Sequence, residues 1–205
     1  MPRLEEVRSL WGGLWQIARG DARGLSLFDI SDEGLTRSFW AIAYCLPIFL
    51  LNAILLRAAY IEVLADPARG HVIFVFQAMV LQLASWAFVL ICTILFGLAF
   101  GYRPLLRPMV VMANWGSVPV LYAIAGLVQP ILHLTRGTGL LSWMLNMSFW
   151  IVAIAIPLYL IWRILLTLVG GPAWKRGGFL LLVLAASLWA IRTLEISLGL
   201  NIPYP

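Results

Sequence analysis

The chain has 205 residues, of which 62% are hydrophobic and only 11% are charged, and its mean hydropathy is +0.95. A soluble domain carries about 25% charged residues, so this composition excludes an ordinary soluble domain and indicates that lipid is the main solvent. The net charge of +5 is spread over loops and span ends without a basic patch that interleaves aromatic side chains, which excludes a nucleic-acid-binding surface.

Residues 1–35 are predicted to form a cytoplasmic segment that consists of an amphipathic helix and a polar connector. One face of a helix over residues 3–18 carries the apolar side chains Leu4, Val7, Trp11, Leu14, Trp15 and Ala18. We expect this face to lie on the cytoplasmic leaflet, and docking on another protein is the alternative. The pair Gly12-Gly13 weakens an isolated helix, so lipid or a partner has to stabilise it.

Residues 36–205 are predicted to form a bundle of five transmembrane helices, so the fold class is an all-α polytopic membrane protein. About 20 apolar residues suffice to cross the hydrocarbon core, and a helix satisfies its own backbone there. The predicted spans are residues 36–61, 71–100, 107–132, 141–169 and 177–200. Ser31, which Asp32 and Glu33 follow, is predicted to be the N-cap of the helix that leads into the first span.

The cations give these spans a direction. With five spans, ten of the 14 cations fall on the side of the N-terminus: Arg3, Arg8, Arg19, Arg23, Arg37, Arg103, Arg107, Arg163, Lys175 and Arg176. The other four are Arg57, Arg69, Arg136 and Arg192. The positive-inside rule therefore predicts a multi-pass protein of the cell inner membrane with its N-terminus in the cytoplasm and its C-terminus on the opposite side. Five tryptophans are predicted to lie at the membrane interfaces: Trp11, Trp15, Trp40, Trp143 and Trp174.

Uncharged polar side chains within the spans are few, namely Asn52, Gln77, Gln82, Asn114 and Asn146. Hydrogen bonding between spans is the leading interpretation. The alternative is a polar substrate cavity at mid-membrane, with Asn52, Asn114, Asn146 and Arg163 as the candidate lining residues.

Prolines inside three spans, Pro47, Pro119 and Pro157, are predicted to kink their helices. The tripeptide at residues 38–40, Ser-Phe-Trp, precedes Pro47 at the same offset at which residues 148–150, again Ser-Phe-Trp, precede Pro157. These two spans run in opposite directions, which is the pattern of an inverted repeat in transporter folds. Chance recurrence is the alternative.

Charged and sulfur-containing side chains within the spans suggest little chemistry. Arg192 and Glu195 are three residues apart on the fifth span and are predicted to form an ion pair near its outer end. Cys45 and Cys92 lie in apolar runs and are predicted to act as small buried hydrophobic residues.

His71 and His133 both fall on the predicted outer side, where they could ligate a metal or a haem. Their spacing matches no ligand motif, so we predict no metal site and no cofactor. The sequence also lacks the motifs of familiar hydrolases, nucleotide-binding enzymes and redox enzymes, and the chain is therefore predicted not to be an enzyme.

Two stretches carry a family resemblance: Ala113-Asn114-Trp115-Gly116 with Pro119 after it, and residues 29–47, DISDEGLTRSFWAIAYCLP. Both resemble the bacterial relatives of the Yip family. Five spans and a cytoplasmic N-terminal segment without a catalytic motif are similar as well, so the resemblance covers about residues 30–200. It implies a membrane bundle without established chemistry; eukaryotic members engage small GTPases through cytoplasmic segments. The resemblance assigns no functional residue.

The sequence thus predicts a non-enzymatic scaffold or accessory subunit of a larger inner-membrane complex. Its predicted contacts are membrane lipid and other membrane subunits or further copies of itself, without nucleic acid. A small transporter or channel component with a polar cavity is one alternative. A haem- or quinone-associated subunit that uses His71 and His133 is the other.

Overall fold

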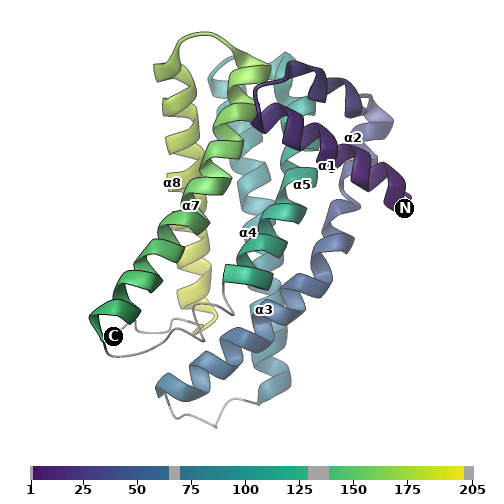
Figure 1. Cartoon of the computed structure of the whole chain (residues 1–205). Coiled ribbons are helices and arrows are strands. Elements are labelled where there is room, and N and C mark those ends of the chain that lie inside the picture. The colour runs from purple at the N-terminus through teal and green to yellow at the C-terminus, as the bar shows by residue number, and fades with distance from the viewer. Residues whose placement is uncertain (1, 65–69, 129–138, 201–205) are drawn as a thin grey trace.

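A computed structural model describes residues 2–64, 70–128 and 139–200 of the chain. Over these residues the elements are all helical, and five helices are long and apolar enough to cross a membrane. The predicted all-α membrane bundle is therefore confirmed, and the chain is a multi-pass membrane protein. The five helices run roughly along one direction, and the N-terminal helix α1 (Leu4–Ala18) lies across them near one end (Figure 1).

The spanning helices follow the predicted order but differ at their ends. They are α3 (Ala41–Leu64), α4 (His71–Ala99), α5 (Leu106–Ala123), α7 (Leu140–Val169) and α8 (Ala173–Ser197). After α5 the chain continues as a short π-helix, η3 (Ile124–Val128), and the predicted end at residue 132 lies outside the described residues. Helix α8 begins earlier than predicted because extended Pro172 supplies its N-cap, which places Lys175 and Arg176 in its first turns.

The first predicted span is divided into two helices. Helix α2 (Asp32–Ser38) ends before a turn at Phe39 and Trp40, and α3 begins directly afterwards. The predicted N-cap of α2 is confirmed, because Ser31 Oγ accepts a hydrogen bond from the backbone N–H of Gly34 at 3.0 Å. Because of this division, α2 lies at the end of the bundle, whereas α3 runs through the bundle as a span.

The turn between α7 and α8 lies at the same end of the bundle as α1 and α2 (Figure 1). Gly170 and Gly171 form this turn with φ angles of +59° and +66°, which only glycine adopts without strain. Arg176, 6% exposed, donates to both of their carbonyls and lies over the Trp162 ring with its guanidinium carbon 5.2 Å from the ring centroid. One of the ten cations at this end therefore closes the α7–α8 hairpin.

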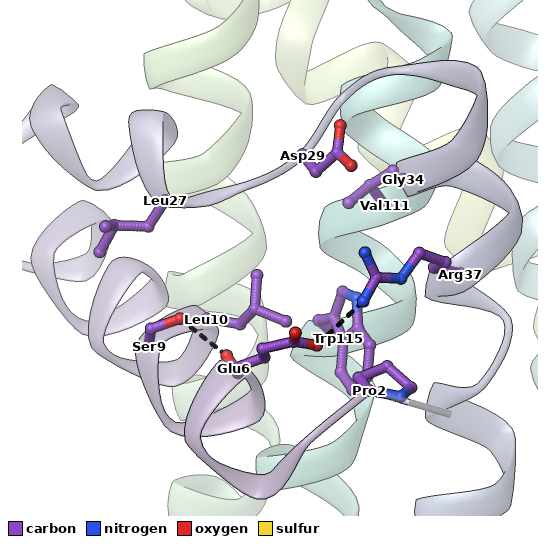
Figure 2. A pocket seen from close by; sticks show the side chains of 10 residues that line it. All are labelled: Pro2, Glu6, Ser9, Leu10, Leu27, Asp29, Gly34, Arg37, Val111 and Trp115. Carbon is purple, nitrogen blue, oxygen red and sulfur yellow. Dashed lines mark hydrogen bonds and ion pairs between the residues drawn. The ribbon is translucent and has the colours of Figure 1, made fainter.

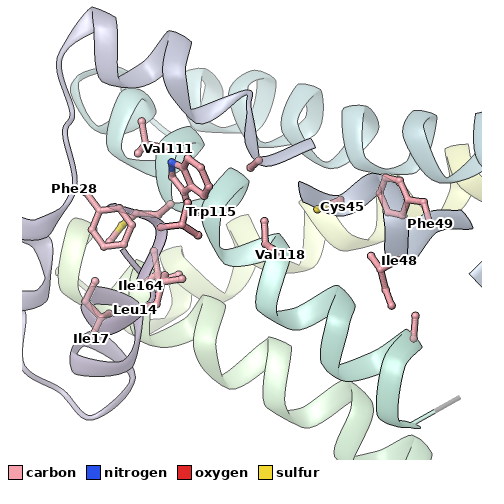
Figure 3. Close-up of a cluster of buried hydrophobic side chains, with 14 residues drawn as sticks. Leu14, Ile17, Phe28, Cys45, Ile48, Phe49, Val111, Trp115, Val118 and Ile164 are labelled. Carbon is pink, nitrogen blue, oxygen red and sulfur yellow. The ribbon is translucent and has the colours of Figure 1, made fainter. Parts of the chain in front are cut away.

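Helix α1 belongs to the hydrophobic core of the bundle. Val7, Leu14 and Ile17 are at most 4% exposed and pack in one cluster with Val111 and Trp115 of α5 (Figure 3). At roughly 25 cal/mol per Å² of apolar surface, each of these side chains contributes about 1.5–3 kcal/mol when it is buried. The N-terminal segment is thus joined to the span core by burial.

The buried face of α1 differs from the apolar face that the sequence predicts. Ile17 is buried although it was not assigned to that face, whereas Trp11 and Trp15 are 37% and 61% exposed. The bundle contacts α1 along one narrow strip, and the two indoles lie beside that strip. Arg19 covers the Trp15 ring at 4.8 Å.

Helix α1 ends in a Schellman motif that turns the chain back across it. Gly20, with φ of +95°, donates to the Ile17 carbonyl, and Asp21 donates to the Gln16 carbonyl, each at 2.9 Å. The chain then forms the short 3₁₀ helix η1 (Ala22–Leu27), which Asp21 caps. Hydrogen bonds from the Arg23 side chain and backbone hold the pKa of Asp21 below its ordinary value.

The crossing of α1 and η1 explains one of the two adjacent glycines. A Cβ atom at Gly13 would lie 2.8 Å from the Gly24 carbonyl oxygen and 2.8 Å from the Phe28 ring. A Cβ at Gly12 would meet nothing within 4 Å. Gly13 therefore allows two backbones to approach each other, whereas Gly12 only weakens the helix.

We expect Gly13→Ala to loosen the N-terminal segment, because the backbone of η1 would have to move away. Amide hydrogen exchange of residues 4–28 in lipid nanodiscs measures the effect, and exchange should become faster than in the wild type.

Gly12→Ala is the matched control and should slow exchange in the same segment, because alanine improves helix propensity by up to about 1 kcal/mol. Equal exchange in the two variants would contradict the crossing described here.

Candidate functional site

A cavity of about 390 Å³ lies in the middle of the bundle, and all five spanning helices line it. Its walls are mainly apolar and include Leu90 of α4, Val120 of α5 and Leu160 of α7. The lining residues Ser85 and Gly116 lie near the midpoints of α4 and α5, so the cavity lies at mid-span. Small-molecule sites typically have volumes of about 300–1,000 Å³ and apolar walls with a few polar groups.

One edge of the cavity is polar, where α3 meets α4. Asn52 Nδ2 donates to Gln82 Oε1 at 2.9 Å. Gln82 Nε2 in turn donates to the backbone carbonyls of Phe49 at 2.9 Å and Ala78 at 3.3 Å. The hydrogen-bonding capacity of Gln82 is therefore used within the protein, and Gln82 holds Asn52 at the cavity wall.

Two serines add hydroxyl groups to the wall. Ser85 donates to the Leu81 carbonyl and Ser117 donates to the Asn114 carbonyl, each at 2.7 Å and within the same helix. A hydroxyl has one proton, so each serine presents only acceptor lone pairs to other groups. The polar edge therefore accepts hydrogen bonds more readily than it donates them.

No charged side chain of the described residues lines the cavity. A bare ion at mid-membrane would lose its hydration without gaining a counter-charge, which is costly. The arrangement therefore suits a neutral guest with a large apolar part.

Helix α7 faces the cavity with a narrow stripe. Pro157, Leu160 and Ile164 lie on this stripe and line the cavity. The same stripe runs on toward the start of α7 through Ala153 and Asn146, which are more covered than the residues beside them.

Only one of the four predicted cavity residues lines this cavity, namely Asn52. Asn114 is fully buried elsewhere and donates to Ser38 Oγ at 2.8 Å, which ties α2 to α5. Asn146 shares the stripe of α7 but lies 11 residues before Pro157, roughly 16 Å along the helix at 1.5 Å per residue. Its amide donates to the Ser142 carbonyl in its own helix.

Arg163, the fourth predicted cavity residue, holds the end of α1. Its Nε donates to the Ile17 carbonyl at 3.4 Å, and Tyr159, one turn earlier on α7, donates to the Ala18 carbonyl at 2.9 Å. The last carbonyls of a helix have no partner within it and carry partial negative charge. A cation and a hydroxyl from α7 therefore satisfy them, and Gly20 leaves the space that the guanidinium occupies.

A second, smaller pocket of about 180 Å³ lies between α1, α2 and α5 (Figure 2). Glu6 and Arg37 form an ion pair across it at 3.0 Å, and Leu10 and Trp115 line its apolar side. Both charged side chains are about half exposed, so the pair contributes no more than about 1 kcal/mol.

Asp29, which also lines the pocket, accepts a hydrogen bond from the Ser31 backbone N–H at 3.0 Å. Because these charged groups already have partners within the chain, we assign this pocket to the docking of the N-terminal segment.

Arg192 and Glu195 form an ion pair at 2.7 Å on α8. Arg57, 4% exposed, donates to His71 Nδ1 at 3.3 Å and lies over the Phe74 ring. One ring nitrogen of His71 therefore accepts a hydrogen bond from Arg57. No group of three potential metal ligands occurs among the described residues, and His133 lies outside them.

The predicted interfacial tryptophans are all exposed: Trp11, Trp15, Trp40, Trp143 and Trp174. Free cysteines Cys45 and Cys92 are buried and half-buried.

The two Ser-Phe-Trp stretches have different surroundings. Ser38 is buried and receives the hydrogen bond from Asn114, whereas Ser148 is exposed and donates to the Met144 carbonyl of its own helix.

Sequence reasoning missed three residues of the site. Gln82 was noted only as a polar residue, and Ser85 and Ser117 were not singled out. Gln82 and Ser85 are three apart in an otherwise apolar run, which places them on one helical face and is the signal that could have found them.

Comparison of the chain with protein-family models, with curated proteins and with solved structures finds no match. The resemblance to bacterial relatives of the Yip family therefore stays a prediction.

We expect Tyr159→Phe to weaken the attachment of α1 by about 0.5–1.5 kcal/mol, because the Ala18 carbonyl loses its hydrogen bond. Amide exchange of residues 14–20 should become several-fold faster, as measured in nanodiscs.

Ser148→Ala is the control, since its hydroxyl bonds only within α7. If exchange in residues 14–20 responds equally to both substitutions, Tyr159 does not hold α1.

Proposed function

We propose that this protein binds a hydrophobic molecule between its spans and serves as a non-enzymatic carrier or transport component. The observation that carries the proposal is the mid-span cavity that all five spanning helices line. A channel for ions is disfavoured by the uncharged wall. The polar mid-membrane cavity expected from the sequence is replaced in this proposal by an apolar cavity with one polar edge.

The size of the cavity supports an occupant. The cavity is partly open, and its walls are almost entirely apolar. Without an occupant the side chains of these walls have no packing partners on the cavity side. A hydrocarbon chain in the cavity would restore most of the lost van der Waals contacts.

We expect Ala113→Leu to reduce binding, because Ala113 lines the cavity and a larger side chain takes up its volume. The probe is a photoactivatable alkyl chain in phospholipid vesicles that hold the purified protein, and labelled peptides are identified by mass spectrometry. Labels in the wild type should fall on residues 82–90, 112–121 and 157–164 and should be lost in the variant.

Ala155→Leu is the matched control, since Ala155 lies exposed on α7 and the substitution is the same. If labelling of the cavity segments is equal in the two variants, or no label reaches these segments in the wild type, the proposal is wrong.

A second candidate function is an accessory subunit in a larger membrane complex, and the first half of α7 favours it. Among residues 140–156 only Ala153 is buried. Large apolar side chains cover the rest of the circumference, including Trp143, Met147, Trp150 and Ile151. A span so little covered by the described residues has surface to pack against another span.

A photo-crosslinking amino acid at Ile151 tests this candidate in the native membrane. We expect crosslinks to protein from position 151, and only to lipid from position 188 on α8, where Leu188 is similarly exposed. Lipid adducts alone at both positions would argue against an accessory subunit.

We further propose that the protein lies in the cell inner membrane with α1 on the cytoplasmic side. The positive-inside rule supports this orientation, because the ten cations of the N-terminal side greatly outnumber those of the other side.

A further inference from the structure

The polar edge of the cavity has a particular balance of donors and acceptors. Asn52 uses one amide hydrogen on Gln82, and its second hydrogen and its carbonyl oxygen make no hydrogen bond to the described residues. The hydroxyl groups of Ser85 and Ser117 donate to backbone carbonyls.

Ser117 Oγ also has the Cys45 thiol at 4.0 Å, and Trp86, whose buried Nε1–H makes no hydrogen bond to the described residues, lines the same cavity. Asn52 therefore offers a guest one acceptor oxygen and one donor hydrogen, and Ser85 adds a further acceptor oxygen.

The free groups of Asn52 favour a guest that both donates and accepts. A ketone, an ester or an ether can only accept, so it would leave the carbonyl oxygen of Asn52 without a donor. A hydroxyl group both donates and accepts, so it can bond to the Asn52 amide in both directions. A buried polar group that remains unpaired is costly. The cavity should therefore bind a guest with a hydroxyl group more tightly than a guest that can only accept.

The size of the cavity limits the apolar part of the guest. A dry cavity of about 150 Å³ holds benzene, so 390 Å³ holds on the order of fifteen carbon atoms. That is the volume of one hydrocarbon chain.

The guest should also be uncharged. No charged side chain of the described residues lines the cavity. The nearest cation along α7, Arg163, is directed at the end of α1 instead. An ionised headgroup would therefore be left without a counter-charge.

We propose that the cavity takes a neutral single-chain molecule of about fifteen carbons whose O–H group hydrogen-bonds to Asn52. This inference rests on the proposed function and adds the chemical class of the guest. A long-chain alcohol and a protonated long-chain carboxylic acid share the O–H donor, and both fit the class.

The test compares three photoactivatable C15 probes in vesicles that hold the full-length protein: a primary alcohol, its methyl ether and the corresponding carboxylic acid. The methyl ether keeps the chain and the acceptor oxygen but cannot donate. We expect the wild type to be labelled about fivefold to tenfold more by the alcohol than by the ether, as one hydrogen bond implies. Labelling by the acid should fall as pH rises and the acid ionises, whereas labelling by the alcohol should not change.

Asn52→Leu should bring the alcohol-to-ether ratio close to one while labelling by the ether persists. Asn52→Ala removes the same amide group with a smaller side chain and should have the same effect, which keeps the test open if Asn52→Leu does not fold. A ratio in the wild type near one, or one that neither substitution changes, overturns this inference while the proposed function stands. If Ala113→Leu leaves labelling by every probe unchanged, the proposed function itself fails.

Discussion

Polar groups in the middle of a bilayer have no water to bond to, and this constraint explains the hydrogen bonds that several polar side chains make within the spans. Ser85 and Ser117 bond to their own helices, Asn114 bonds to Ser38, and Gln82 bonds to two backbone carbonyls and to Asn52. Each bond contributes only about 0.6–2 kcal/mol, but an unsatisfied group would cost more. Asn52 retains both a donor and an acceptor next to the cavity.

A related requirement, that the last carbonyls of a helix need hydrogen-bond donors, ties the N-terminal segment to the spans. The last carbonyls of α1 receive donors from α7, and the core side chains of α1 pack on α5. On the other side of the segment, Arg107 pairs with Asp32 at 2.9 Å, and Tyr44 donates to the Pro2 carbonyl. The sequence predicts a separate amphipathic helix and connector. In the structure this segment and the end of the bundle therefore form one folded unit.

The spans were predictable because the thickness of the hydrocarbon core sets a minimum length of apolar sequence. The docking of α1 on the bundle was not predictable, because an amphipathic pattern looks the same whether lipid or protein covers the apolar face. The cavity was only partly predictable. Asn52 and Asn114 are both asparagines in apolar runs, and which of them faces an open space depends on how each helix is rotated by its neighbours. Arg163 was predicted to line the cavity. Its actual partner, the end of α1, was missed because it is far away in sequence.

The contact between α7 and the end of α1 has a consequence for the order of folding. Tyr159 and Ala18 are separated by 141 residues, and Arg163 and Ile17 by 146. Helix α1 is synthesised before the spans, yet its C-terminal turn gains its hydrogen-bond donors only after the fourth span has been made and inserted. Until then the apolar face of α1 and these carbonyls have to be covered by the membrane surface or by whatever assists insertion. A helix made before every span is thus among the last elements to reach its final position.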